Sequence, residues 1–571
     1  MMPHKWKGNI HGLCHLVHAA CVDADGASRV ADGGHQAKHA PRVVAKAGRQ
    51  RARHYFPCHR GTYTSQARIK RLNRSAEYAM REAELWGAAY AVQGGTYARP
   101  AMDELWKTLL FNQFHDILPG SSIARVNREA EAELSSVVDG ARKIADNILG
   151  KLLPQSGLSA ANALSWERDA IMRLPDDFQN GGVTADGTPI PTQATPEGVI
   201  GRVHMPSLGI TAIKPKNNNA PGQTANVRAY TENGVFVLEN DVLRAEFGTY
   251  GEITRLYDKS ARRLLNKSPL NRMRMFRDIP RKFDAWDIDS LYVDEEIALT
   301  DAAELEVLYE GPLEGALRIR RKIGNSSYVQ TVRLESGCKL IRFETTVEWH
   351  ELHKLLKVAF PFDVHADSAL HEIQFGHIRR PNDPSTPYNK QRFEVCNHKW
   401  TAFAEEGYVT GVLNNCKYGV GTLYGSIDLT LLRAAACPEM GADQGEQMFT
   451  YALYAFDGSF AACDIVRNAY ELNIPARLFD GCGAPVSLLT IDQPGIIADT
   501  VKPAEDGYGV VVRLYESKRT ACRTRIRFGI PVREAYRTDM LENILAPVDV
   551  ENGEIELELR PFEVVTLKLV P

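Results

Sequence analysis

Apolar residues recur at every third or fourth position in three stretches between residues 64 and 152, a spacing typical of amphipathic helices. The first stretch predicts a helix over residues 64–90, and the second predicts one that begins near residue 101 and continues to the break at Pro119–Gly120. Proline cannot continue the helical hydrogen-bond ladder, and glycine permits the turn that follows. The third stretch covers residues 123–152. Three such helices joined by short turns predict a three-helix bundle.

Beyond Pro154 the apolar positions alternate with polar ones, a period of two that indicates β-strands. Clear examples are residues 328–334 and 339–349, and similar runs, separated by Gly, Pro, Asn and Asp, recur to the end of the chain. The pattern does not resemble a βαβ series, so antiparallel sheets are expected. The predicted fold class is α+β and multidomain, with a helical bundle over residues 59–154 followed by large antiparallel β-sandwich domains over residues 155–571.

Residues 1–58 differ from the rest of the chain, because they hold seven of the sixteen histidines and show no sustained apolar period. One interpretation is an atypical, disordered leader, or a stretch that is not translated in the native frame of its gene. The other is a metal-binding or anion-binding arm. The histidine spacings fit no tetrahedral zinc pattern, which favours the leader. The arm would be built on His4, His11, His15, His18, His35 and His39.

Length, charge and cysteine usage exclude several classes of protein. A chain of 571 residues is long enough for several packed domains. A net charge of -3 gives no general basic field for nucleic acid, and no run of about 18 or more apolar residues predicts a membrane span. The ten cysteines form no CxxC pair and no dense framework, which is typical of free thiols in a reducing compartment. We therefore expect a cytoplasmic protein with no nucleic-acid or membrane partner.

The stretch NQFHDILPGSSI at residues 112–123 places a polar cluster inside an amphipathic helix pattern. In a helix, His115 and Asp116 would point about 100° apart and could not comfortably serve one partner. A lone histidine is more often satisfied by a neighbouring hydrogen bond than bound to a metal. A carboxylate near a helix C-terminus opposes the helix dipole, so Asp116 needs another source of stabilisation. The pattern is typical of a pocket rim at which each group has a different partner.

Several long motifs resemble those of one enzyme family. KTLLFNQFHDILPGSSI at residues 107–123 and HRGTYTSQARIKRLNR at residues 59–74 resemble elements of the family 38 glycoside hydrolases, the retaining alpha-mannosidases, especially their bacterial and cytosolic members. The resemblance covers nearly everything after residue 58. Further matching motifs lie at residues 162–168, 238–263, 278–289, 347–364 and 413–419.

This resemblance implies a mannose-cleaving site shared between an N-terminal α/β barrel, the helical bundle and the β domains, with alpha-mannoside oligosaccharides as substrates. In the family, zinc is held by the His and Asp of an early HxD motif, by the nucleophilic Asp and by the His of NQFHD. On that resemblance His115 matches a ligand of zinc, or of another divalent cation. Asp116 matches a carboxylate that holds the sugar in its subsite.

The chain also departs from the family pattern. No HxD motif followed by an aromatic run precedes residue 59, and Tyr55, Phe56, Pro57 and Cys58 stand where the family usually has an acidic residue. We therefore expect the barrel to be missing and can identify neither the catalytic nucleophile nor the general acid. Retaining hydrolysis needs two carboxyl groups about 5 Å apart, and one histidine holds zinc only weakly.

The favoured interpretation is the bundle and β portion of an alpha-mannosidase that does not turn over by itself. A separate barrel-bearing chain or a homo-oligomer would then be a partner. The alternative is a non-catalytic carbohydrate-binding or assembly module in which Trp166, Trp286 or Trp400 stacks on sugar rings. We expect those tryptophans to be buried instead.

Overall fold

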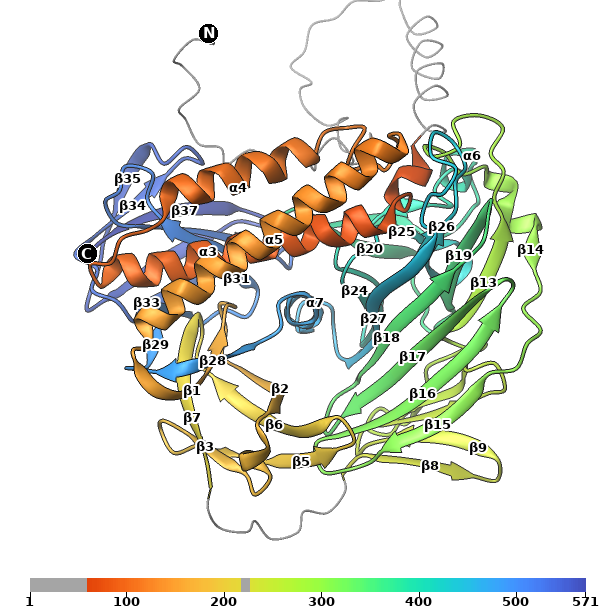
Figure 1. The fold of residues 1–571 in the computed structure, drawn as a ribbon, viewed down its shortest axis with the longest axis horizontal. Helices are drawn as coiled ribbons and strands as arrows, with labels where there is room; N and C mark the ends of the chain where they lie inside the picture. Colours follow the sequence, from red (N-terminus) through yellow and green to blue (C-terminus); the bar gives the residue numbers. More distant parts are fainter. Residues whose placement is uncertain (1–58, 217–225) are drawn as a thin grey trace, which may run out of the picture.

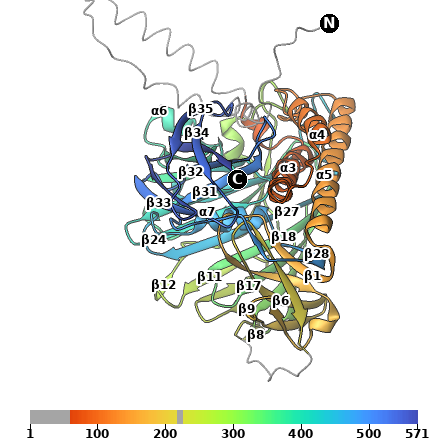
Figure 2. The ribbon, with the colours of Figure 1, turned by 90° about the vertical axis from the view of Figure 1, so that its left-hand side faces the viewer.

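The computed structural model describes residues 59–216 and 226–571, so both interpretations of residues 1–58 lie outside the described residues. After a short 3-10 helix η4 (Arg60–Tyr63), the chain forms three long helices, α3 (Ala67–Val92), α4 (Arg99–Asn112) and α5 (Ala124–Leu152). They lie side by side along one edge of the molecule (Figure 1), and Figure 2 shows them on one side of the sheets. The predicted three-helix bundle is confirmed.

The end of α4 differs from the prediction. The helix stops at Asn112 and does not continue to Pro119–Gly120. The backbone N–H of Gln113 is shared between the carbonyls of Leu109 and Leu110, and the chain then winds through tighter turns up to Gly120. Pro119 therefore lies at the end of the series of turns that follows the helix. The regular helix ends about two turns before it.

The largest sheet has nine strands and lies at the right of Figure 1. Its paired strands run antiparallel, and β17 and β18 contain the alternating runs that the sequence predicts at residues 328–334 and 339–349. In spatial order the strands are β15 (Glu304–Tyr309), β16 (Glu314–Ile323), β17 (Ser326–Glu335), β18 (Leu340–Trp349), β27 (Gly445–Asp457), β24 (Tyr408–Asn414), β23 (Trp400–Glu405), β20 (Ser368–Ile373) and β21 (Gly376–Pro381).

Two further sheets share a buried core with the nine-stranded sheet, which makes this part of the chain a sandwich. Phe343 of β18, Phe360 of β19 and Leu256 of β11 all lie in that core. The first sheet contains β14 (Glu296–Ile297), β13 (Arg272–Arg277), β19 (Lys354–Phe360), β26 (Ile427–Arg433), β25 (Gly419–Gly421) and β22 (Val395–Cys396). The second contains β12 (Arg263–Leu264), β11 (Ile253–Asp258), β10 (Leu243–Phe247), β9 (Val235–Glu239) and β8 (Arg228–Glu232).

Two sheets follow the bundle in the chain and lie below it in Figure 1. One contains β28 (Arg477–Cys482), β1 (Gln155–Asn162), β7 (Gly209–Pro215), β3 (Gly182–Thr184) and β4 (Pro189–Ile190), with β29 (Val486–Ser487) also paired to β7. The other contains β2 (Arg168–Leu174), β6 (Gly198–Met205) and β5 (Thr192–Thr195). The pairing of β28 with β1 ties the C-terminal part of the chain to the strands next to the bundle.

The C-terminal part forms two more sheets, whose apolar side chains share a core with the bundle. Trp86 of α3, Val512 of β32 and Leu567 of β37 all belong to this core. One sheet contains β31 (Ile496–Pro503), β32 (Val510–Glu516), β37 (Val564–Val570), β34 (Glu534–Thr538) and β35 (Ile544–Val548). The other contains β30 (Leu489–Ile491), β33 (Cys522–Phe528) and β36 (Glu554–Leu559).

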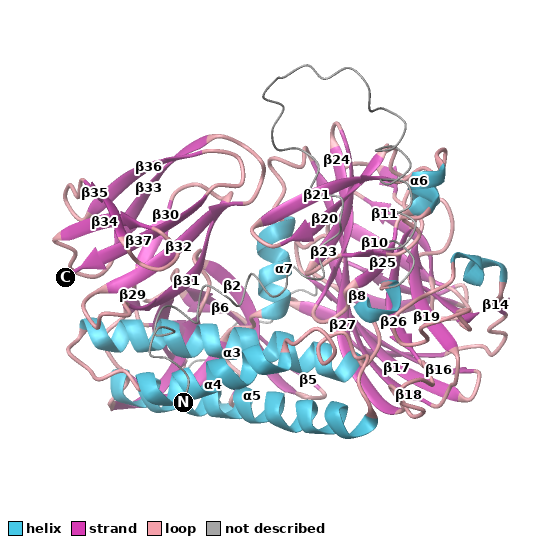
Figure 3. Ribbon diagram, turned by 90° about the horizontal axis from the view of Figure 1, so that it is seen from above, coloured by secondary structure: helices cyan, strands magenta, loops and turns pink. Residues whose placement is uncertain are grey.

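Seen from above, the C-terminal sheets and the nine-stranded sheet lie on two sides of the short helix α7 (Ile465–Asn473), and both meet the bundle (Figure 3). The remaining short helices are α6 (Pro387–Lys390), η5 (Asp176–Phe178), η6 (Ser290–Asp294) and η7 (Leu423–Gly425). Trp166 and Trp400 are buried, as expected, and cannot offer a sugar-stacking surface, whereas Trp286 is half-buried. Across residues 59–216 and 226–571, the helices are too short or too polar to span a membrane.

Candidate functional site

The polar cluster that follows α4 divides into an inward pair and an outward pair. Asn112 and Gln113 are buried: the Asn112 amide donates to Glu133 on α5 at 2.7 Å, and the Gln113 amide donates to Asn73 at 3.1 Å and Glu77 at 2.9 Å on α3. These bonds join the three helices. The inward pair therefore has a structural role.

His115 and Asp116 lie on the segment of residues 113–122, which we call the His115 turn. Their side chains are 69% and 51% exposed, and His115 Nε2 lies 3.5 Å from Asp116 Oδ2. The expectation that the two side chains diverge is therefore wrong. It assumed a continuous helix, and because α4 ends at Asn112 the turn allows both groups to face one location.

The His115 turn is anchored to the first turn of α3 and to the residues just before that helix. The buried Lys70 ammonium donates to the carbonyls of Leu118 at 3.0 Å and Pro119 at 3.2 Å. Gly120 adopts a φ of +75°, and a Cβ there would lie 2.3 Å from the Ser65 carbonyl oxygen. Only glycine fits such a close approach in the left-handed region. The backbone that carries His115 and Asp116 is therefore held firmly, although both side chains are exposed.

A second segment, the loop of residues 278–290 between β13 and β14, also contacts the residues just before α3. The Gly61 N–H donates to the Trp286 carbonyl at 2.9 Å, and the Ser65 hydroxyl donates to the Ala285 carbonyl at 2.8 Å. We call residues 59–66 the anchor segment. The His115 turn and the 278–290 loop are far apart in the sequence, and both contact this short stretch of chain.

Buried charges hold the 278–290 loop in place. The fully buried Arg433 bonds Asp278 through Nε at 2.5 Å and donates through Nη2 to the Asp287 carbonyl at 2.5 Å. Asp284 accepts from the backbone N–H groups of Ala436 at 2.7 Å and Cys437 at 3.0 Å. Burial raises the pKa of Asp278, and the Arg433 cation opposes that shift. Asp278 and Asp284 thus stabilise the loop.

Asp287 differs from Asp278 and Asp284 in its pKa. Burial raises its pKa to about 6, while the Ile288 backbone N–H and the Arg60 cation act in the opposite direction. A carboxyl group with this pKa changes its charge near neutral pH, a property typical of functional sites. The sequence analysis did not single out Asp287 as a functional residue. The signal was present, because three aspartates occur within six residues around Trp286.

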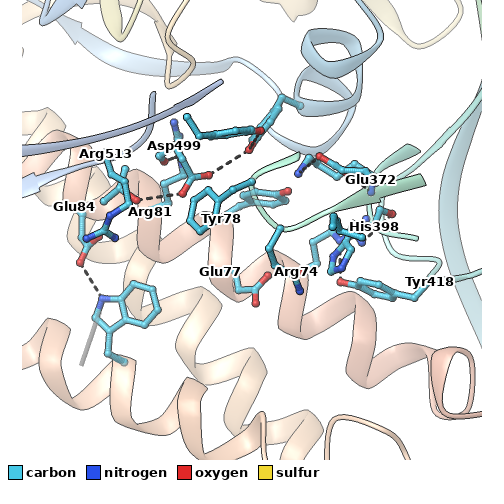
Figure 4. A pocket seen from close by; sticks show the side chains of 18 residues that line it. Arg74, Glu77, Tyr78, Arg81, Glu84, Glu372, His398, Tyr418, Asp499 and Arg513 are labelled. Atoms are coloured by element: carbon cyan, nitrogen blue, oxygen red, sulfur yellow. Dashed lines mark hydrogen bonds and ion pairs between the residues drawn. The ribbon is translucent and has the colours of Figure 1, made fainter. Parts of the chain in front are cut away.

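A cleft of about 130 Å³ lies between α3 and the sheets (Figure 4). Arg74 and Arg81 extend from α3 toward the residues of the sheets, where they donate to the backbone carbonyls of His398 and Asp499. On the sheet side, Lys399 pairs with Glu372 at 2.8 Å and lies over the Tyr470 ring. The two arginines join the bundle to the sheets, and the Lys399–Glu372 pair lies within the sheet region, so the charged groups of the cleft have structural roles.

The described residues do not by themselves fit a complete zinc centre. Within residues 59–216 and 226–571, no group of three or more His, Cys, Asp or Glu side chains is placed to hold a metal ion. His115 and Asp116 offer two donors, whereas a protein zinc site usually takes three or four protein ligands. The exposed pair can still bind other groups, since His115 Nε2 and Asp116 Oδ2 lie close together, while Asp116 Oδ1 accepts from the Ser121 hydroxyl at 3.4 Å.

Family comparisons agree with this architecture. The model described as "Alpha mannosidase middle domain" matches residues 57–152, and "Glycosyl hydrolases family 38 C-terminal domain" matches residues 238–440. A third, "Glycosyl hydrolases family 38 C-terminal beta sandwich domain", matches residues 495–567, and together the three cover more than half of the chain. The chain belongs to glycoside hydrolase family 38. The resemblance inferred from the motifs is confirmed.

Relatives with curated names support the same assignment. This family 38 chain is 32% identical over 538 residues to alpha-mannosidase 2C1 of Homo sapiens, a match that covers 90% of this chain and 50% of the relative. It is 29% identical to alpha-mannosidase G of Dictyostelium discoideum, over 90% of this chain and 52% of the relative. The chain thus spans about half the length of the curated relatives it matches.

A solved structure shares the fold of this family 38 chain. An alpha-mannosidase from Enterococcus faecalis V583 superposes with a TM-score of 0.74 at 17% identity, over 90% of this chain and 68% of that protein. At this level of identity the likeness establishes the arrangement of helices and sheets, and the chemistry has to be argued from the site.

Proposed function

We propose that this chain is the bundle and β portion of an alpha-mannosidase-type glycoside hydrolase, which cleaves terminal alpha-mannosides with retention and with the help of zinc. The observation that carries the proposal is the exposed His115–Asp116 pair on a firmly anchored turn. Membership of family 38 and relatives named alpha-mannosidases support the substrate class. The seven cysteines of the described residues are free thiols, which supports a cytoplasmic location.

His115 and Asp116 have different roles in this proposal. His115 would supply one nitrogen ligand to zinc or another divalent cation, and the remaining ligands would come from outside the described residues. A bound zinc ion supplies Lewis-acid chemistry and orients oxygen groups of a substrate. Asp116 would accept hydrogen bonds from sugar hydroxyls. Its proximity to His115 suits this division, because a metal ligand and a sugar-binding carboxylate must meet at one subsite.

Turnover needs more than this pair. A retaining glycoside hydrolase uses two carboxyl groups about 5 Å apart, one as nucleophile and one as general acid and base. We assign neither role to a described residue. The proposal therefore places the remaining groups of the centre outside the described residues, of which a separate barrel-bearing chain would be one source, and it predicts weak zinc binding by the chain alone.

Zinc titration and hydrolysis of 4-nitrophenyl α-mannoside by the purified full chain test the proposal. We expect weak zinc binding that falls further in His115→Ala, and no release of 4-nitrophenol without a partner. The matched control is His365→Ala, because His365 is also exposed but lies far along the chain in the sandwich.

Two results would contradict the proposal in different ways. Tight stoichiometric zinc binding together with hydrolysis by the chain alone would overturn the incomplete centre. Glycan binding that is unchanged when His115 and Asp116 are both replaced by Ala, with zinc binding also unchanged, would favour a non-catalytic carbohydrate-binding module.

A further inference from the structure

A buried lysine and a buried cysteine meet where the C-terminal sheets approach the nine-stranded sheet. Lys518 follows β32, and Cys463 lies between β27 and α7, the helix that lies between the two groups of sheets in Figure 3. The Nζ atom of Lys518 lies 3.5 Å from the Sγ atom of Cys463. The two residues are far apart in the sequence, so the tertiary structure alone brings an amine and a thiol into contact.

Further contacts hold the amine of Lys518 beside the sulfur. Its Nζ donates to the Cys463 carbonyl at 2.6 Å and to the Phe460 carbonyl at 3.4 Å, and it lies 4.7 Å from the centre of the Phe460 ring. The backbone N–H of Lys518 donates to the Glu516 carboxylate at 2.7 Å. Because both the backbone and the end of the side chain are held, the amine and the thiol remain neighbours.

Burial makes the amine of Lys518 more reactive than that of an exposed lysine. Lys518 is 9% exposed and Cys463 is 3% exposed. Burial lowers the pKa of Lys518, because the charged form loses its hydration, while the nearby Cys463, Asp464 and Glu516 act in the opposite direction. A lower pKa gives a larger share of the neutral amine, which is the form that can attack an electrophile.

The pair lies directly beneath exposed stretches of chain. Cys463 is flanked in the sequence by the exposed residues Ala462 and Asp464, and Lys518 is followed by the exposed Arg519. The path from solvent to the sulfur is therefore short, and an oxidant as small as hydrogen peroxide can cross it through small movements of these segments.

We propose that Cys463 and Lys518 form a reversible covalent sulfur–nitrogen link when the protein meets a peroxide. In the first step the Cys463 sulfur attacks the O–O bond, so the thiol is oxidised to a sulfenic acid and one oxygen of the peroxide leaves as water. In the second step the neutral amine of Lys518 attacks that sulfur. An S–N bond forms as the S–O bond breaks, and the hydroxyl group leaves as water with a proton from the amine.

The overall reaction converts one thiol, one amine and one hydrogen peroxide into a sulfenamide and two water molecules. Sulfur is oxidised and the peroxide is reduced. Two molecules of a thiol reductant restore the thiol and the amine and are themselves joined as a disulfide. The link fastens the C-terminal sheets to the loop between β27 and α7, and it does not depend on the chemistry proposed for His115 and Asp116.

Oxidation of the purified full chain with hydrogen peroxide, followed by mass spectrometry of its proteolytic peptides, tests the link. We expect one joined pair of peptides that contains Cys463 and Lys518 and has lost two hydrogen atoms, and we expect dithiothreitol to separate the pair. The melting temperature should rise by a few degrees on oxidation and return on reduction, because the link restricts the unfolded chain.

Two variants separate the two steps. Cys463→Ser removes the sulfur and should abolish the link. Lys518→Arg keeps a buried cation, but a guanidinium does not lose its proton and is a poor nucleophile, so the sulfenic acid should persist and react with dimedone. Cys416→Ser is the matched control, because Cys416 is also buried but lies elsewhere in the chain, and it should form the link as the wild type does.

Three results would overturn this inference. The first is an oxidised wild-type protein with no joined peptides, whether Cys463 remains a thiol or becomes a sulfinic acid. The second is a joined pair that is still found in Cys463→Ser. The third is equal labelling of Cys463 by dimedone in the wild type and in Lys518→Arg, since the amine would then take no part. The first result is read on the wild type and does not require either variant to fold.

Discussion

Charged and aromatic side chains are abundant both in the cleft along α3 and at the surface beside the anchor segment. In the cleft these side chains contact one another, whereas at the anchor segment several of them remain exposed. In the cleft, Lys399 pairs with Glu372, and Arg74 and Arg81 reach carbonyls across the gap between bundle and sheets. At the anchor segment, His115, Asp116 and Phe283 are exposed on a rigid backbone. Composition does not separate the two regions. The two regions differ in whether their charged groups have partners within the protein. A charged group with a partner stabilises the fold, whereas an exposed one remains available to a ligand.

The largest expected effect comes from breaking an ion pair in the cleft. Lys399→Met leaves the carboxylate of Glu372, which is 3% exposed, without its cation. We expect the free energy of unfolding to fall by about 3–5 kcal/mol, because a buried charge without a partner is strongly destabilising. Urea unfolding followed by circular dichroism measures the change.

A double variant serves as the control for the cleft. Lys399→Met combined with Glu372→Leu removes both charges and should recover most of the lost stability. If the single variant is as stable as the wild type, the cleft is not held by this pair, and the contrast with the anchor segment fails.

The second prediction concerns pH and a buried histidine of the sheets. His377 is packed against Trp400, Phe460 and Phe562, and burial lowers its pKa to about 4. The unfolded chain has the ordinary value near 6.5, so between these values the unfolded state binds the proton and the folded state does not. The contribution of His377 to stability is complete above about pH 6.5 and is lost as the pH falls toward 4.

Urea unfolding at pH 7 and pH 5 measures this contribution. From the difference in pKa we expect the wild type to lose roughly 2 kcal/mol more than His377→Phe over that interval. His371 shifts in the same direction and is present in both proteins, so the comparison isolates His377. Equal losses in the two proteins would show that His377 does not sense this pH range.

The smallest effect is expected for the two exposed side chains of the His115 turn, His115 and Asp116, compared with their buried neighbour Gln113. Gln113→Ala removes two buried hydrogen bonds to α3 and should lower the free energy of unfolding by about 1–3 kcal/mol. His115→Ala and Asp116→Ala alter exposed side chains and should change it by no more than about 0.5 kcal/mol. Thermal melts of the three variants compare neighbouring positions directly. A large loss in His115→Ala would place His115 with the structural residues.

Much of the fold could be predicted from local sequence pattern. The three apolar stripes predicted the helices within a few residues at most ends, and the alternation over residues 328–334 and 339–349 lies within β17 and β18. The end of α4 could not be found in this way. The apolar period continues past Asn112, but contacts of Gln113 with Asn73 and Glu77 on α3 accompany the change from helix to turns.

The candidate site, like the fold, could be predicted from the sequence only in part. The sequence by itself singled out His115 and Asp116, and its motifs indicated the family, because residue types and their spacing are local properties of the chain. It could not place Arg60 at one pocket with Phe283 and Asp287, since Arg60 lies far from both in the sequence. Only the tertiary structure decided which polar groups have partners within the protein and which stay exposed. Burial and hydrogen bonding between distant segments set that division, and neither is encoded in the pattern of a single segment.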